Sequence, residues 1–366
     1  MSKSKKKGLS ANAKWGIALV VEILLLVGMV YLYGMTYIEE KIDQIQVVEI
    51  KEENLQINEG SNEAQKGYTT IALFGIDARS NTNMAEGNRS DTIMIASINN
   101  DTKEVRIVSV YRDTLFRIAD GRGITSKVNA AYSFGGPELA IATLNEALDL
   151  QITDFITVNF MALTKAIDDL GGIVVNVRSD ELPVLNSSIT EQIEVTGIYS
   201  DGVWQTGELL LNGTQATAYA RIRSTDQGDI TRTQRQRYVI GQMIAKAKQS
   251  DLSTIDQIID DVFPNVLTSM DKDEIMEFAK SLLSYNLGDT TGFPMAFGNF
   301  STEAKGACLA PADLVTNVSA LHEFLFDTKD YVPTQTVQEI SNALINETGV
   351  RSNGEPIVID TQLLNY

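Results

Sequence analysis

Five arginines lie within residues 219–237, YARIRSTDQGDITRTQRQR, of a chain whose formal net charge is −18. A guanidinium group binds phosphate oxygens through two parallel hydrogen bonds, which a lysine ammonium group does not reproduce. Arg221 and Arg223 are two positions apart, so in an extended segment their side chains share one side. The clustering predicts an anion site, and several guanidinium groups together favour a diphosphate ligand.

Helical spacing adds further polar groups to this arrangement. Asp229 is the expected N-cap of a long amphipathic helix, and Arg232 and Gln236 follow on the same face. The helix N-terminus contributes backbone donors and a partial positive charge that favour a phosphate. Arg235 and Arg237 point elsewhere and are interpreted as solvated surface residues.

Two other interpretations compete with an anion site. Structural ion pairs would use the same residue types at the same positions. A nucleic-acid patch is disfavoured, because no aromatic residues are interleaved with the arginines and the rest of the chain is strongly acidic.

Residue counts exclude several classes of catalytic site. Cys308 is the only cysteine and His322 the only histidine. An intrachain disulfide and an HExxH zinc site are therefore impossible, and a Ser-His-Asp triad or a Cys-His pair would have to use His322. The sequence also lacks a GxxxxGK[ST] phosphate loop. His322 is interpreted as a helix residue with a satisfied ring and no catalytic role.

Hydrophobic patterning predicts the elements that position the charged groups. Strands are expected at 68–77, 91–99, 104–114, 154–160 and 173–177, and helices at 135–150, 161–172, 213–221 and 229–249. Asn212 is the expected N-cap of the short helix that ends near Arg221. Strands alternating with helices predict an α/β fold, in which a mixed central β-sheet is sandwiched between α-helices.

Charged residues gather at one end of the predicted sheet. If the first two strands are antiparallel neighbours, Asp77 at the end of one and Asp91 at the start of the next lie together. The third strand returns to the same end with Arg112, and the other charged residues there are Arg79, Arg89 and Asp113. Asp77 and Asp91 would either pair with the arginines or hold a hard cation together with phosphate oxygens. The residues alone leave both interpretations open.

The N-terminal residues differ from the rest of the chain. A basic tail, 1–14, precedes a predominantly apolar stretch, 15–37, that is long enough to cross a hydrocarbon core of about 30 Å as one helix. The basic flank predicts a cytoplasmic N-terminus and an extracellular remainder. A cleaved signal peptide is disfavoured, because the apolar run is too long for one. The further boundaries are expected at 38–67 for an extracellular stalk or linker, 68–250 for the domain with the charged rim and 251–366 for a mostly helical accessory region.

Six segments carry a resemblance to a known family. They are LFGIDAR (73–79), RSDTIMIASIN (89–99), IVSVYRDT (107–114), KVNAAYSFGGPELAIATLNEALDL (127–150), ITDFITVNFMALTKAIDDLGGIVVNV (152–177) and LNGTQATAYARIRSTDQGDITRTQRQR (211–237). In this order they resemble the LytR-CpsA-Psr family of bacterial membrane-anchored phosphotransferases. The resemblance covers residues 68–250, which would form the catalytic domain.

The resemblance implies transfer of a phosphoglycan from a polyprenyl-pyrophosphate carrier to peptidoglycan. The glycan would be wall teichoic acid, capsule or another secondary wall polymer, and polyprenyl phosphate would be released. The enzyme would lie in the cell membrane of a Gram-positive bacterium through a single span, in contact with membrane lipid. The alternatives are a non-catalytic envelope regulator that binds phosphorylated polyprenyl lipids and a polyprenyl-pyrophosphate hydrolase.

The resemblance also assigns roles to individual residues. It implies Mg²⁺, or Mn²⁺, on Asp77 and Asp91. Arg79 is a further candidate for binding the pyrophosphate. The implied catalytic residues are Arg112, Arg221, Arg223, Asp229 and Arg232. The implied pyrophosphate-binding residues are Arg89, Arg112, Lys127, Arg221, Arg223, Arg232 and Gln236. Asp229 or another carboxylate would take the proton of the attacking sugar hydroxyl.

Charge neutralisation by arginine and a metal explains how an enzyme with one histidine could transfer a phosphoryl group. The polyprenyl tail requires an apolar environment. The helices at 136–149 and 160–170 would either line a tunnel for it or fill the core, since the two look alike in sequence.

Overall fold

The computed structural model of the chain describes residues 37, 39–77, 84–85, 87–225, 228–281 and 284–361. The chain divides into two compact units, Met1–Gln44 and Ile45–Tyr366, and every element discussed below belongs to the second. Among the described residues, no helix has the length and apolar character needed to cross a membrane. The predicted span 15–37 lies outside those residues apart from Tyr37.

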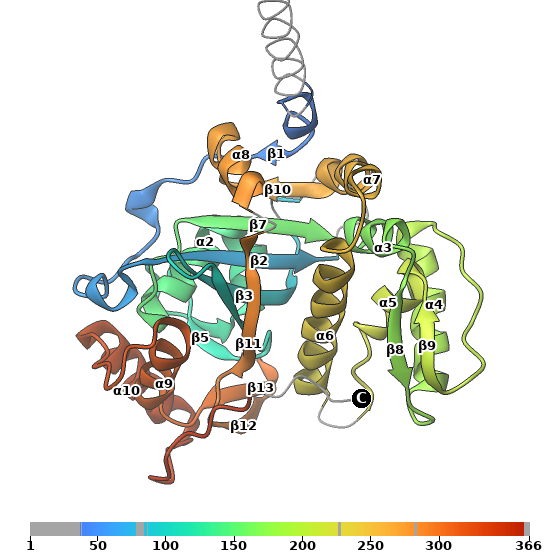
Figure 1. The fold of residues 1–366 in the computed structure, drawn as a ribbon. Coiled ribbons are helices and arrows are strands. Elements are labelled where there is room, and N and C mark those ends of the chain that lie inside the picture. Colours follow the sequence, from blue (N-terminus) through green and yellow to red (C-terminus); the bar gives the residue numbers. More distant parts are fainter. Residues whose placement is uncertain are drawn as a thin grey trace, which may run out of the picture. The chain divides into compact units, whose positions relative to one another are not determined.

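A seven-stranded mixed sheet forms the centre of this unit, in the order β1-β10-β7-β2-β3-β4-β11 (Figure 1). β2, β3 and β4 are consecutive antiparallel neighbours, as the sequence predicts, and β7 is parallel to β2. The strands are β1 (Gln46–Val47), β2 (Tyr68–Ile76), β3 (Ser90–Asn99), β4 (Glu104–Val110), β7 (Asp154–Asn159), β10 (Val266–Thr268) and β11 (Asn286–Phe293). This topology brings the end of β2, the start of β3 and the end of β4 to one rim.

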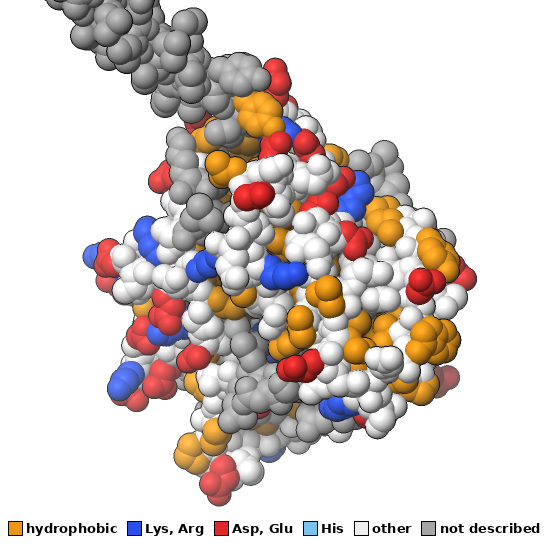
Figure 2. Space-filling model, turned by 45° about the vertical axis from the view of Figure 1, so that its right-hand side comes forward, with side chains coloured by type: hydrophobic (Ala, Val, Ile, Leu, Met, Phe, Trp, Pro, Cys, Tyr) orange, Lys and Arg blue, Asp and Glu red, His pale blue; other side chains and the backbone are white. Residues whose placement is uncertain are grey.

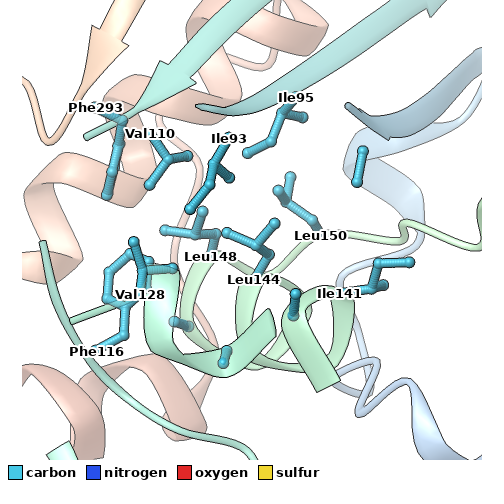
Figure 3. Close-up of a cluster of buried hydrophobic side chains, with 14 of the residues drawn as sticks. Ile93, Ile95, Val110, Phe116, Val128, Ile141, Leu144, Leu148, Leu150 and Phe293 are labelled. Carbon is cyan, nitrogen blue, oxygen red and sulfur yellow. The ribbon is translucent and has the colours of Figure 1, made fainter. Parts of the chain in front are cut away.

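The main hydrophobic core covers one face of the sheet. Ile93 and Ile95 of β3 face Leu144 and Leu148 of helix α2, which spans Asn129–Leu148 (Figure 3). The helices of this core are α2, α9 (Leu314–Phe326) and α10 (Gln335–Thr348). Because α2 buries its apolar residues here, it fills the core and does not form a tunnel.

α2 begins at Asn129, earlier than the predicted residue 135, and bends at Gly135 and Gly136 before Pro137. Gly136 has a φ of +66°, and a Cβ atom there would lie 2.5 Å from the carbonyl oxygen of Ala85. Glycine alone tolerates both the positive φ and this approach. The bend therefore fixes α2 against the segment that leads into β3 at the charged rim.

A second, smaller core lies to one side of the sheet (green in Figure 1). Its elements are α3 (Phe160–Asp169), β8 (Ile173–Val177), α4 (Leu182–Thr196), β9 (Gly207–Leu211) and α5 (Gly213–Tyr219). The predicted helix at 161–172 and strand at 173–177 correspond to α3 and β8. Asn212 caps α5 as predicted, since its side chain accepts a hydrogen bond from the Gln215 backbone N–H.

α6 (Asp229–Ala247) packs between the second core and the face of the central sheet opposite α2. Its N-cap is Gly228, with a φ of +65°, and not Asp229 as the sequence predicts. Because Asp229 is the first helical residue, its carboxylate does not cap the helix. It faces Arg232 one turn further along.

The region 251–366 contains more strand than the sequence predicts. Its helices are α7 (Leu252–Val262), α8 (Lys272–Ser281), α9 and α10, while β12 (Phe297–Thr302) and β13 (Gly306–Pro311) form a hairpin. β10 and β11 join the central sheet at two separate places. β10 has three residues, and β11 carries two glycines and an aspartate, so neither has the alternation that marks a strand. This region therefore completes the sheet and is not an appendage.

The predicted linker 38–67 also contributes to the compact unit, which begins at Ile45. Its 46–47 segment forms β1, and Leu55 is fully buried in the main core. Asn145 of α2 donates a hydrogen bond to the Leu55 carbonyl oxygen at 3.0 Å. Because the segment is mostly polar, its sequence does not predict these contacts.

His322 lies in α9, as predicted for a helix residue. Its Nε2 is 3.0 Å from the carbonyl oxygen of Leu148, and its ring stacks on Tyr331 with centroids 3.8 Å apart. Its Nδ1 is buried and has no hydrogen-bond partner among the described residues, so the ring is only half satisfied. Burial lowers the pKa of His322 to about 4.

We expect His322 to make stability depend on pH. The unfolded chain binds a proton with a pKa near 6.5 and the folded chain only near 4, so stability falls as pH falls through this window. His322→Phe keeps the stacking and should remove roughly 2–3 kcal/mol of this pH dependence. Urea unfolding at pH 4.5, 5.5 and 6.5 measures it, and identical slopes in both proteins would refute it.

Candidate active site

Three arginines converge on Asp91, the second residue of β3. Arg112, just after β4, places Nη1 2.6 Å from Asp91 Oδ1, and Arg223 places Nη2 2.7 Å from Oδ2. Arg232 of α6 donates to the Asp91 backbone carbonyl oxygen at 2.8 Å. Burial opposes ionisation of Asp91, but Arg112, Arg223 and Arg232 outweigh it and lower its pKa. Residues far apart in the sequence therefore meet at the predicted rim.

A second group of charges adjoins this cluster. Arg112 Nε lies 3.5 Å from Asp229 Oδ1 and 3.7 Å from Asp113 Oδ2. Lys127 Nζ lies 2.8 Å from Asp113 Oδ1. Lys127 is delivered by a short hairpin, β5 (Leu115–Arg117) and β6 (Thr125–Lys127). The hairpin follows β4 directly, which explains how Lys127 reaches the rim.

Arg232 and Asp229 form a buried pair at the start of α6. Arg232 is 1% exposed, and its Nη2 lies 2.7 Å from Asp229 Oδ1. Burial lowers the pKa of Arg232 to about 10, helped by Arg223 and Arg112 and opposed by the two aspartates. Burial also raises the pKa of Asp229, although Arg232 and Arg112 act in the opposite direction. The positive charge of Arg232 is therefore only partly neutralised by the neighbouring aspartates.

Several buried polar atoms of the cluster lack a hydrogen-bond partner among the described residues. They are Arg112 Nε, Arg232 Nε, Gln236 Oε1 and both carboxylate oxygens of Asp229, of which Oδ1 is ion-paired with Arg232 without hydrogen-bond geometry. Buried polar atoms in folded proteins are almost always paired, so a group of orphans at one place indicates a ligand. The donors here suit phosphate oxygens, and the acceptors suit a hydroxyl group.

Arg221 lies apart from the ion-pair cluster. Its Nη1 donates to Gln192 Oε1 at 2.8 Å, and its guanidinium carbon lies 4.5 Å from the centre of the Phe160 ring. The sequence places Arg221 and Arg223 on one side of an extended segment, but the chain turns between them, so that they have different partners. Gln192 and Phe160 carry no motif signal, and sequence reasoning misses them.

Arg235 is fully buried and is not the solvated residue that the sequence predicts. It forms an ion pair of 2.7 Å with Glu181, which is also fully buried. It also donates to the Ile222 carbonyl oxygen at 3.2 Å and to Thr225 Oγ1 at 2.7 Å. Arg235 therefore holds the segment that carries Arg221 and Arg223. Arg237 is buried as well; α6 packs on several sides, which leaves these positions no access to solvent.

The remaining predicted residues lie at the edge of the cluster. Ile76 is opposite Ser90 in the register of β2 and β3, so Asp77 and Asp91 are at the same end of the sheet. Asp77 and Arg89 are exposed and join none of the ion pairs among the described residues. Arg79 lies outside those residues.

Asp77 and Asp91 are the two carboxylates of the predicted magnesium site. Carboxylates suit Mg²⁺, which usually completes its shell with water and phosphate oxygens. Both oxygens of Asp91 accept hydrogen bonds from arginines, whereas Asp77 is exposed. Among the described residues no set of three metal-ligating side chains exists. The two carboxylates therefore fit a cation shared with a phosphate ligand and do not form a site closed by protein.

An apolar cavity of about 280 Å³ adjoins the arginines, between the central sheet and α3 and α6. α3 contributes Phe160 and Leu163. The stripe of α6 predicted to face a core packs on the second core through Val239 and Met243 and also lines the cavity. The lining residues of α6 are Gln236, Val239, Ile240, Met243 and Ile244. α2 contributes none. Of the two helices considered for a tunnel, only α3 lines this apolar cavity, and its Phe160 also contacts Arg221.

A profile of the LytR-CpsA-Psr family matches residues 31–292. The chain belongs to this family. It is 30% identical over 290 residues to the polyisoprenyl-teichoic acid–peptidoglycan teichoic acid transferase TagU of Oceanobacillus iheyensis, covering 75% of this chain and 83% of TagU. The structure of Bacillus subtilis TagV matches with a TM-score of 0.55 and 27% identity, covering 73% of this chain and 99% of TagV.

The fold also matches TagT bound to LI-WTA, with a TM-score of 0.52 and 23% identity over 78% of this chain and 93% of TagT. These matches show the α/β fold of the family. The arginine cluster and the cavity described above lie within the matched region.

Breaking the Arg235–Glu181 pair should destabilise the protein strongly. Arg235→Met removes the closest partner of the buried Glu181 carboxylate and leaves it with Arg178, whose guanidinium group lies 3.6 Å away and whose backbone N–H donates to it. Breaking a buried ion pair typically costs about 3–5 kcal/mol. Arg235→Met combined with Glu181→Leu removes both charges and should recover at least half of this loss. Urea unfolding measures the free energy of unfolding of both variants. A loss below about 1 kcal/mol for Arg235→Met is typical of an exposed ion pair and would contradict a buried one.

Gln192 should position Arg221 for an anion. Gln192→Met keeps the side-chain volume but removes the acceptor, and we expect affinity for inorganic pyrophosphate to fall about tenfold. Thr190→Val, on the exposed side of α4, is the matched control. Calorimetric titration measures affinity and thermal melting measures stability. Unchanged affinity with a lowered melting temperature would limit Gln192 to a packing role.

Proposed function

We propose that this protein transfers a phosphoglycan of the teichoic acid type from a polyprenyl-pyrophosphate carrier to peptidoglycan. The observation that carries the proposal is a cluster of arginines around Asp91, of which Arg232 is buried and Arg223 partly exposed, together with an apolar cavity whose Phe160 contacts Arg221. A diphosphate with a long apolar tail is the ligand class that suits both. The printed name of TagU, a teichoic acid transferase acting on peptidoglycan, supports the same assignment.

The reaction is a phosphoryl transfer. A hydroxyl oxygen of peptidoglycan attacks the phosphorus that bears the glycan, the bond from this phosphorus to the bridging oxygen breaks, and polyprenyl phosphate leaves. Such reactions depend on orientation and on stabilising charge at phosphate oxygens. Arg112, Arg223 and Arg232 supply that stabilisation, which is strongest at Arg232 because this side chain is buried from water.

The diphosphate would enter the cluster by replacing existing contacts. Arg112 and Arg223 both form ion pairs with Asp91, so the two arginines are already oriented toward one point. Arg221 stands over Phe160, at the edge of the cavity, and suits the phosphate nearest the lipid. Lys127 and Arg89 suit the outer phosphate and the glycan side of the linkage.

Asp229 is the group we assign to the proton of the attacking hydroxyl. Its Oδ1 forms ion pairs with Arg232 and Arg112, whereas its Oδ2 is buried without a hydrogen-bond partner among the described residues. Burial raises its pKa toward the range in which a carboxylate is an effective base. The acidic limb of the pH–rate profile would then report this group.

Magnesium would assist as a shared cation. Asp77 and Asp91 would hold it, and when bound it would neutralise charge on the phosphate oxygens. The apolar stretch 15–37, outside the described residues, would anchor the enzyme in the cell membrane with the active site on the outer side.

The transfer can be tested with the full-length protein in detergent. A polyprenyl-pyrophosphate glycan, Mg²⁺ and peptidoglycan strands should yield polyprenyl phosphate and phosphodiester-linked glycan. Arg112→Lys and Arg232→Lys keep the charge but lose the fork and should lower the rate about 10²–10³-fold. Arg122→Lys, at an exposed ion pair with Asp120, is the control.

Three outcomes would contradict the proposal. Release of polyprenyl phosphate at the same rate without peptidoglycan would identify a hydrolase. Lipid binding without release would identify a regulator. Full activity in the presence of a chelator would contradict the role of magnesium. It would also contradict the roles given to Asp77 and Asp91 as its ligands.

A further inference from the structure

Two large aromatic side chains are displayed on the loop between α4 and β9. Tyr199 is 77% exposed and Trp204 is 80% exposed. Figure 2 brings forward the side of the molecule that carries α4, β8 and β9, and hydrophobic side chains stand on its surface there. Exposed aromatic surface of this extent on a soluble unit indicates an interaction site.

The loop that presents them is fixed in place. Val203, next to Trp204, is buried in the second core. Asn186 of α4 holds it from both sides, since its Nδ2 donates to the Val203 carbonyl oxygen at 2.7 Å and its Oδ1 accepts from the Val203 N–H at 2.8 Å. Further hydrogen bonds to the loop come from Gln215 to the Asp201 carbonyl oxygen and from Asn212 to Ser200.

A rigid loop with exposed aromatic rings has little conformational entropy to lose on binding. Folding alone gives no reason to order a loop this firmly while leaving its two largest side chains in water. Val203 and Asn186 would hold the loop equally well with small polar residues at 199 and 204. The aromatic pair therefore points to a ligand.

Charge selects the class of ligand. Residues 173–211 contain α4, β8 and β9, and their one basic residue, Arg178, is paired with Asp180. Glu181 is buried against Arg235. The remaining acidic residues, Glu191, Glu194, Asp201 and Glu208, are exposed and make this surface negative. Anionic lipid headgroups and phosphate-containing polymers would be repelled. An uncharged saccharide is not, and its ring faces stack on tyrosine and tryptophan while carboxylates such as Asp201 accept hydrogen bonds from its hydroxyl groups.

The distance between the loop and Arg221 sets a minimum length for the ligand. The loop is tied to the N-terminal end of α5 through Asn212 and Gln215, whereas Arg221 follows the C-terminal end. α5 has seven residues, so the two places are separated by at least about 10 Å along the helix. A ligand that reaches from the arginines to the aromatic pair must span at least this distance, as a chain of several sugars does.

We propose that Tyr199 and Trp204 form a platform for the uncharged glycan strand of the peptidoglycan acceptor. This assignment rests on the proposed transfer function. The platform would hold sugars away from the reacting hydroxyl and so raise acceptor affinity without touching the diphosphate.

The chain offers a direct optical probe of this contact. It has two tryptophans, so Trp15→Phe leaves Trp204 as the only one. The full-length variant in detergent is titrated with chitohexaose, an uncharged N-acetylglucosamine oligomer. We expect a saturable change in Trp204 emission, and none with an equal concentration of soluble teichoic acid. No change with chitohexaose, or an equal change with both ligands, would overturn the proposal.

Transfer kinetics separate the platform from the active site. Trp204→Ala and Tyr199→Ala should each raise KM for peptidoglycan about tenfold, the effect of truncating one interface aromatic, with kcat and KM for the lipid donor unchanged. Val332→Ala, an exposed apolar residue elsewhere, is the control. Wild-type KM values in both variants, or a change in oligomeric state that accompanies the loss, would refute the glycan platform.

The two proposals can fail separately. Transfer by the wild type with unaltered kinetics in both aromatic variants would refute only the platform. Saturable binding of chitohexaose at Trp204 without any transfer by the wild type would support saccharide recognition and refute the transferase.

Discussion

The active-site region depends on holding like charges together in a poorly solvated place. Arg112, Arg223 and Arg232 come from β4, a loop and α6, and they meet at Asp91. Each guanidinium group disfavours the others, and the lowered pKa of Arg232 records both this repulsion and its burial. The aspartates offset the repulsion enough for folding and leave positive charge uncompensated. A dianionic ligand removes the remaining penalty, so the same imbalance that strains the free protein provides affinity.

Groups outside the cluster keep it in order. Arg235 and Glu181 form a buried pair whose hydrogen bonds reach the Ile222 carbonyl oxygen and Thr225, so the loop with Arg221 and Arg223 is fixed from behind. Gln192 fixes Arg221 in the same way from α4. Buried ion pairs contribute little net stability compared with apolar packing, and their attested use is to specify one arrangement. Here the specified arrangement is that of the substrate-binding arginines.

Sequence reasoning predicts the rim but not its interior. Antiparallel β2, β3 and β4 follow from period-two patterning and a short turn, which suffices to bring Asp77, Asp91 and Arg112 to one end. Whether Arg235 is solvated or buried depends on what packs against α6, and this is set by contacts distant in the sequence. The strands β10 and β11 are missed for a related reason. Their backbone pairing is imposed by neighbouring strands, and their side chains carry no alternation.

The two faces of the sheet show why a core and a cavity cannot be told apart from apolar residues alone. α2 and the stripe of α6 are both apolar, yet α2 is close-packed and α6 borders a hollow. Small residues contribute to the difference, since Gly75 and Ala220 line the hollow and leave room there. Phe160 and Gln236 line it too, and they lie beside Arg221 and on the helix of Arg232. Since the apolar space opens directly beside the cationic groups, a ligand with a charged head and an apolar tail fits both parts at once. A purely polar or purely apolar molecule would leave one of them unmatched.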